Sequence, residues 1–98
     1  MEKRTPHCSL AVVKSLVIAG RIRVTSSALA GAAVLDMGLS EIVAVVGALT
    51  PRDFHKSMTT HADHTLWQDV YRPMTAAGKV YVKLTVYDDV LVVSFKEL

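Results

Sequence analysis

The hydrophobic pattern of the chain changes near residue 50, from helical spacing before it to strand alternation after it. In the first half, apolar residues recur every three or four positions, as on one face of a helix. Gly20 and Pro51 are expected to end helices, and residues 21–24 alternate like a short strand. The pattern predicts three helices with N-caps at Thr5, at Ser26 or Ser27, and at Asp36 or Ser40.

The C-terminal part of the chain predicts a β-hairpin. Residues 80–87 alternate between apolar and polar side chains, and residues 90–95 are rich in β-branched and aromatic ones. Asp88 and Asp89 separate the two runs and are expected to form the loop, which fixes the register. One face is then apolar and belongs to the core, with Val82 opposite Phe95, Leu84 opposite Val93, and Val86 opposite Leu91.

The other face of this hairpin pairs Tyr81 with Lys96. A phenol and an ammonium group would lie side by side on a stiff element, where side chains are positioned well for chemistry. The same pattern is also typical of a solvated surface pair, so both interpretations stand. If residues 74–77 form a four-residue loop, Gln68 lies opposite Lys83 and on the same face as Tyr81.

Composition and charge limit the classes of protein that fit. The 98 residues are 51% hydrophobic and 20% charged, which predicts one globular domain over residues 1–98. A net charge of +2 permits a local RNA-binding patch without requiring one. The single cysteine, Cys8, excludes an internal disulfide and a cysteine-based zinc site. Charged residues interrupt both long apolar stretches, so we expect no membrane segment and a cytoplasmic location.

The middle of the chain resembles a known family. The segments DFHKSMTT (53–60), DHT (63–65) and WQDVYRP (67–73) resemble the motility quorum-sensing regulator toxins. The segments MEKRTPH (1–7), KVY (79–81) and VLVVSFK (90–96) resemble the same family. The resemblance spans essentially the whole chain and is weakest between residues 26 and 49.

This resemblance implies a fold, an activity and a partner. The fold is expected to be α+β and RelE-like, with N-terminal helices packed on a mainly antiparallel β-sheet. The activity implied is that of a type II toxin, an endoribonuclease that cuts messenger RNA without a metal ion or other cofactor. The partner implied is an antitoxin with a zinc-binding and a DNA-binding portion, without which this chain is not expected to bind DNA.

The resemblance also implies which residues act. Four positions match the family's catalytic residues: Lys56, Gln68, Tyr81 and Lys96. Four more are expected to bind substrate: His55, Met58, His64 and Arg72. His55 stands where the family pattern has tyrosine, and its imidazole can stack on a base or titrate near neutral pH. The expected chemistry is attack by the RNA 2′-hydroxyl, which leaves 2′,3′-cyclic phosphate ends.

Several features have more than one interpretation. His61, Asp63 and His64 could bind a metal, but a loop near the RNA is favoured because no helix frames them. Core packing is favoured over base stacking for Trp67 and Tyr71, and Met58 is either part of a base pocket or a core methionine. Two other functions stay open: a non-catalytic protein-binding module, and a decayed toxin that still binds its antitoxin.

Overall fold

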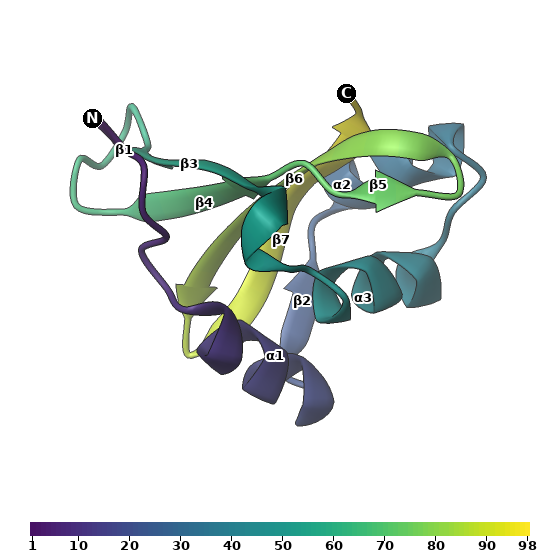
Figure 1. Ribbon diagram of the computed structural model, residues 1–98, viewed down its shortest axis with the longest axis horizontal. Coiled ribbons are helices and arrows are strands. Elements are labelled where there is room, and N and C mark those ends of the chain that lie inside the picture. The colour runs from purple at the N-terminus through teal and green to yellow at the C-terminus, as the bar shows by residue number, and fades with distance from the viewer.

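The computed structural model describes residues 1–98 as three helices packed on one face of a mainly antiparallel sheet (Figure 1). The helices are α1 (Leu10–Ile18), α2 (Ser26–Val34) and α3 (Leu39–Gly47), followed by the short 3₁₀ helix η1 (Pro51–Asp53). The strands are β1 (Glu2–Lys3), β2 (Ile22–Val24), β3 (Phe54–Thr59), β4 (Trp67–Tyr71), β5 (Met74–Thr75), β6 (Gly78–Tyr87) and β7 (Asp89–Glu97). The order is β1-β3-β4-β6-β7-β2, with β5 beside β6 and β2 parallel to β7. The predicted α+β class is confirmed.

The first helix begins later than the sequence predicted. Ser9, not Thr5, is the N-cap of α1, and its hydroxyl accepts a hydrogen bond from the Val12 N–H at 3.3 Å. The reason is tertiary, because the Asp69 carboxylate accepts the N–H groups of His7 and Cys8 at 3.0 Å each. These bonds hold the preceding segment against β4 and outside the helix.

The other helix boundaries are set by a glycine and by side-chain oxygens. Gly20 has φ of +75° and ends α1 as predicted, with the Arg21 N–H donating to Leu16 O at 2.8 Å. The predicted caps of the next two helices are each wrong by one or two residues. Thr25 caps α2 and Gly38 precedes α3, where the Glu41 carboxylate accepts the Gly38 N–H at 2.8 Å.

The predicted register of the β6–β7 hairpin is confirmed in its outer half and wrong near the turn. Tyr81 lies opposite Lys96, Val82 opposite Phe95, and Lys83 opposite Ser94. Past these pairs a β-bulge shifts the register by one residue, and Asp88 makes the turn with φ of +63°. Near the turn, the core residues of β7 are therefore Val90 and Val92, whereas Leu91 and Val93 are only half-buried.

The connection between β4 and β6 also differs from the prediction, but each side chain of β4 stays on its predicted face of the sheet. β5 pairs Met74 with Lys79, so the expected four-residue loop is a two-residue turn at residues 76–77. Val70 rather than Gln68 then lies opposite Lys83. Because the register differs by two residues and side chains alternate with period two, Gln68 keeps its predicted face.

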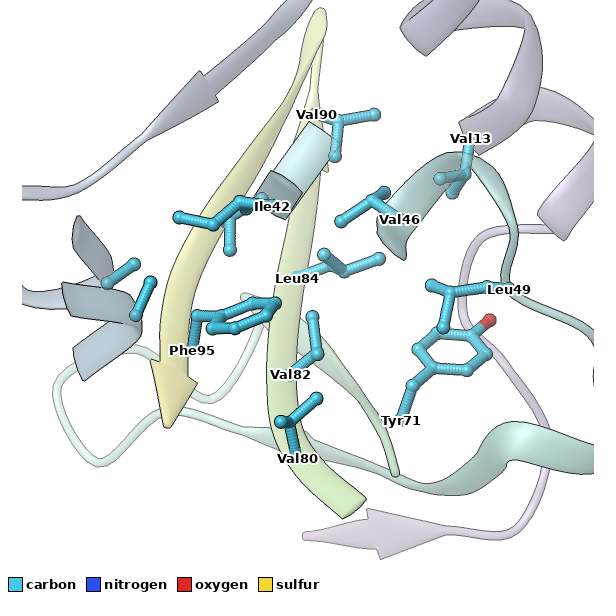
Figure 2. Packing of buried hydrophobic residues seen from close by; sticks show 13 residues of the cluster. Val13, Ile42, Val46, Leu49, Tyr71, Val80, Val82, Leu84, Val90 and Phe95 are labelled. Atoms are coloured by element: carbon cyan, nitrogen blue, oxygen red, sulfur yellow. The ribbon is translucent and has the colours of Figure 1, made fainter. Parts of the chain in front are cut away.

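The core lies between the helices and one face of the sheet. Val13, Ile42 and Val46 from the helices pack against buried residues of β4, β6 and β7 (Figure 2). Tyr71 is fully buried in this cluster, as predicted for core packing. No single helix is long and apolar enough to cross a membrane, and only the pair α2 and α3, bent by 94°, meets that requirement together.

Candidate active site

Side chains from four strands meet on the sheet face that lies opposite the hydrophobic core. Lys56 of β3 is opposite Val70 of β4, which is opposite Lys83 of β6, which is opposite Ser94 of β7. Since directly paired residues point to the same side of a sheet, these four residues form one row across it. Val70 is fully buried although it lies on this face. We call this surface the open face.

The neighbouring rows of the open face hold the other predicted catalytic residues. Tyr81 and Lys96 form the next row on one side, and Met58 lies opposite Gln68 on the other side. The structure thus brings Lys56, Gln68, Tyr81 and Lys96 to one surface, with Met58 beside them. The alternation of β6 could have revealed Lys83, which the sequence analysis did not single out as a site residue.

Cations surround the Tyr81 phenol. The ammonium groups of Lys96 and Lys83 lie 5.1 and 5.9 Å from the centre of its ring. These distances fall within the range of cation–π attraction. Burial raises the pKa of Tyr81 above that of a free phenol, and the charge of Lys56 opposes this effect only partly. The phenol therefore stays protonated near neutral pH and is a hydrogen-bond or proton donor rather than a base.

A carboxylate that the sequence analysis missed contacts Lys56. Glu2 belongs to the two-residue edge strand β1, where it lies opposite Met58. Its Oε1 is 2.5 Å from the Lys56 Nζ, and this hydrogen bond lowers the pKa of the carboxyl group. A strand of two residues leaves no alternation to detect, so only the tertiary structure could reveal this pair.

His55 lies at an irregularity in β3. Phe54 pairs with Tyr71 and Lys56 with Val70, which leaves His55 as the extra, bulged residue. Burial lowers the pKa of its imidazole, and the positive charges of Arg72, Lys56 and Arg4 lower it further. The ring is therefore neutral near pH 7 and suited to stacking rather than to charge pairing. Arg72 itself is exposed beside the end of β4.

Two predicted features lie outside this cluster. His64 belongs to the exposed loop that joins Thr59 of β3 to Trp67 of β4, beyond the rows described above. In the same loop Asp63 accepts hydrogen bonds from the Thr65 N–H and hydroxyl at 2.8 and 2.6 Å. No three metal-ligating side chains gather in the molecule.

Trp67 lies on the other face, covered by the N-terminal segment. The His7 ring stacks on it with centroids 5.7 Å apart, and the Lys3 ammonium lies 4.1 Å from its ring centre. The Trp67 ring is therefore occupied by protein side chains, but it is only half-buried and lies outside the hydrophobic core, so the prediction of core packing is wrong for this residue.

Comparison with known proteins identifies the family. The model of the motility quorum-sensing regulator family, described as the toxin of MqsA, matches residues 5–97. The mRNA interferase toxin MqsR of Escherichia coli (strain K12) is 56% identical to the chain over 97 residues, which is 99% of each protein. The match covers every strand of the open face except β1. The chain belongs to the family of motility quorum-sensing regulator toxins.

Proposed function

We propose that this chain is the toxin of a toxin–antitoxin pair, an endoribonuclease that cuts messenger RNA. The family match and the mRNA interferase that is 56% identical support the class of activity. The observation that carries the proposal is the gathering of Lys56, Gln68, Tyr81 and Lys96 on the open face. A non-catalytic binding module has no need for such a convergence of donors and cations.

The proposed reaction needs no metal ion. The RNA 2′-hydroxyl gives its proton to water, and its oxygen forms a bond to the adjacent phosphorus. The bond from phosphorus to the 5′-oxygen then breaks, and that oxygen takes up a proton. The products are a 2′,3′-cyclic phosphate and a 5′-hydroxyl, and DNA is inert because it lacks the attacking group.

The positions on the open face suggest a role for each residue. Lys56 and Lys96 stabilise the extra negative charge of the pentacoordinate phosphorane, which is typically the largest catalytic contribution. Tyr81, which stays protonated, donates to a phosphate oxygen or to the leaving 5′-oxygen. Gln68 orients the scissile phosphate or contacts a base edge. Arg72 holds a neighbouring phosphate.

The bases next to the cut would bind beside these groups. Neutral His55 stacks on one base, and Met58, which shares a row with Gln68, lines the adjacent pocket. His64 contacts a more distant part of the RNA from the loop that joins β3 and β4.

Glu2 adds a step before catalysis. The Glu2 carboxylate accepts a 2.5 Å hydrogen bond from the Lys56 ammonium group. The substrate phosphate must therefore displace this carboxylate before it can bind Lys56. Glu2 thus keeps the lysine in place in the free protein, and it releases the ammonium group when RNA binds. It acts as a positioning residue and not as a catalytic one.

The proposed partner is a cognate antitoxin with a zinc-binding and a DNA-binding portion, in keeping with the family description as a toxin of MqsA. Any zinc and any direct DNA contact would belong to that partner. Because the substrate is messenger RNA, the proposed location is the cytoplasm.

The test is cleavage of a defined messenger RNA in excess EDTA, with the cut ends mapped. We expect discrete cuts with cyclic-phosphate ends, abolished in the double variant Lys56→Ala/Tyr81→Phe. Arg23→Ala removes one exposed cation from β2 at the opposite edge of the sheet and should leave cleavage intact. Cutting that requires added magnesium or zinc would overturn the mechanism. No cutting, even with ribosomes present, would favour the binding module or the decayed toxin.

A further inference from the structure

A concave site lies on the helix side of the sheet, across β3 from the open face. It is a cleft of about 630 Å³ between the N-terminal segment 4–10 and the strands β3 and β4. Volumes of this size are typical of sites that bind small molecules. Phe54 and Tyr71 form its aromatic wall, with ring centres 5.5 Å apart in an edge-to-face arrangement.

The cleft holds a polar atom that has no partner in the protein. The Tyr71 hydroxyl is buried and makes no hydrogen bond, although nearly all buried polar groups in proteins do. In Figure 2 this hydroxyl lies at the end of the ring that points away from Val80 and Val82. Burial raises the pKa of the Tyr71 phenol, so the group is a donor without an acceptor. Leaving such a group unsatisfied costs about 1–3 kcal/mol, which a bound acceptor would offset.

Arg4 and the imidazole N–H of His7 supply further donors to the cleft, and the Ser9 hydroxyl there can donate as well as accept. Arg4 is exposed and has no salt-bridge partner. The Lys3 ammonium donates to Nδ1 of His7 at 3.1 Å, which places the proton of a neutral imidazole on Nε2. No carboxylate lines the cleft, whereas the other cleft of the molecule is lined by Glu41 and Asp53. A ligand rich in acceptor atoms, with negative charge and a flat ring, fits this lining.

The cleft is connected electrostatically to the open face. Arg4 directly follows β1, and its positive charge lowers the pKa of both His55 and Glu2. Arg4 therefore lines the cleft and is also close enough to Glu2 and His55 to act on both groups. A single RNA strand that crosses the outer edge of the sheet can follow this line of cations.

We propose that this cleft binds a nucleotide of the RNA that flanks the cut site. The base lies against Phe54 and accepts a hydrogen bond from the Tyr71 hydroxyl, and the phosphate lies on Arg4. This inference rests on the proposed ribonuclease function, which it deepens by adding a second RNA-binding position outside the catalytic row.

The test compares short and long RNA oligonucleotides that share one cut site. The long ones extend the short one by several nucleotides at the 5′ end, at the 3′ end or at both. We expect a higher kcat/KM for one extended oligonucleotide in the native chain. Tyr71→Phe should reduce this gain about 3- to 10-fold, and Arg4→Ala about 10-fold. The control Arg52→Ala removes a nearby exposed cation that does not line the cleft and should keep the full gain.

Two further measurements separate the possible failures. The first measures binding without cleavage, with the same oligonucleotides carrying a 2′-O-methyl group at the cut site. The fluorescence of Trp67 follows the binding. Arg4→Ala should reduce the slope of log K against log salt by about 0.7. Length-dependent binding without cleavage would contradict the ribonuclease and leave the cleft standing. Cleavage without any length dependence would overturn the cleft proposal alone.

Thermal unfolding completes the test of Tyr71. Because the phenylalanine side chain carries no hydroxyl to leave unsatisfied, we expect Tyr71→Phe to be at least as stable as the native chain while it loses the length-dependent gain. A Tyr71→Phe variant that is less stable and keeps the gain would mean that water satisfies the hydroxyl, and this result would overturn the proposal.

Discussion

Replacing Gly31 by alanine tests how closely α2 approaches the site strand β7. In an ordinary helix interior this change stabilises a protein by about 1 kcal/mol. Here the new Cβ would lie 2.0 Å from the Phe95 carbonyl oxygen, a backbone atom that cannot rotate away. The helix must therefore move away from the strand by roughly 1 Å, which disturbs the fully buried Ala28 and Ala32 on the same helix.

The two effects have opposite signs, and the steric one is larger. Overpacking of a core costs typically 1–3 kcal/mol, and a clash with backbone lies at the upper end of that range. Subtracting the propensity gain leaves a destabilisation of about 2 kcal/mol, which corresponds to a Tm lower by roughly 8–16 °C for a domain of this size. The same Cβ would lie 3.3 Å from the Cβ of Lys96, so the displacement reaches the open face.

Thermal and urea unfolding measure the loss of stability, and RNA cleavage well below the Tm measures the displacement of the open face. We expect cleavage by Gly31→Ala to fall about 10- to 100-fold, as a displacement of 1 Å can cause. Gly47→Ala is the matched control, since its Cβ would lie at an ordinary 3.7 Å from Val17 and should stabilise α3 by about 0.5–1 kcal/mol. A Gly31→Ala variant as stable as Gly47→Ala would refute this account of the α2–β7 contact.

Three further changes test other contacts. Asp69→Asn should lower the free energy of unfolding in urea by about 2–3 kcal/mol, because two backbone N–H groups and the Ser57 hydroxyl lose a charged acceptor, whereas Ser57→Ala should cost only about 1 kcal/mol. Since the pKa of His55 lies below its usual 6.5, the imidazole gains charge only below that pH, and the KM for RNA should fall there in the native chain but not in His55→Tyr. Glu2→Gln should lower the KM about 3-fold by freeing Lys56, and an unchanged KM with a lower kcat would contradict displacement by the phosphate.

Much of the open face could be predicted from the sequence. The alternation of residues 80–87 was enough to place Tyr81 on the open face. Its predicted pairing with Lys96 holds because the bulge in β7 adds one residue and so cancels a turn that is one residue shorter than predicted. The loop before β6 was predicted two residues too long, but an even error does not move a side chain to the other face. Gln68 therefore lies on its predicted face although the predicted loop length was wrong.

The β-bulge in β7 could not be predicted, because its partners lie far away in the chain. The Thr25 hydroxyl donates to Val93 O at 2.9 Å, and the Thr25 N–H donates to Val92 O at 3.1 Å. These bonds from the start of α2 engage the strand where its register shifts. A local pattern contains no record of a contact between residues 68 positions apart.

Local chemistry thus determined the class of fold, the end of α1 at Gly20 and the face of the sheet on which Tyr81 lies, since each depends on neighbouring residues and on the period of the strand. Contacts between distant segments decided the start of α1, where Asp69 holds the preceding backbone, and the core residues of β7. They also decided the pairing of Lys56 with Glu2. Hydrogen bonds and ion pairs of this kind require groups that only the folded chain brings together, so the alternation of residues carries no sign of them.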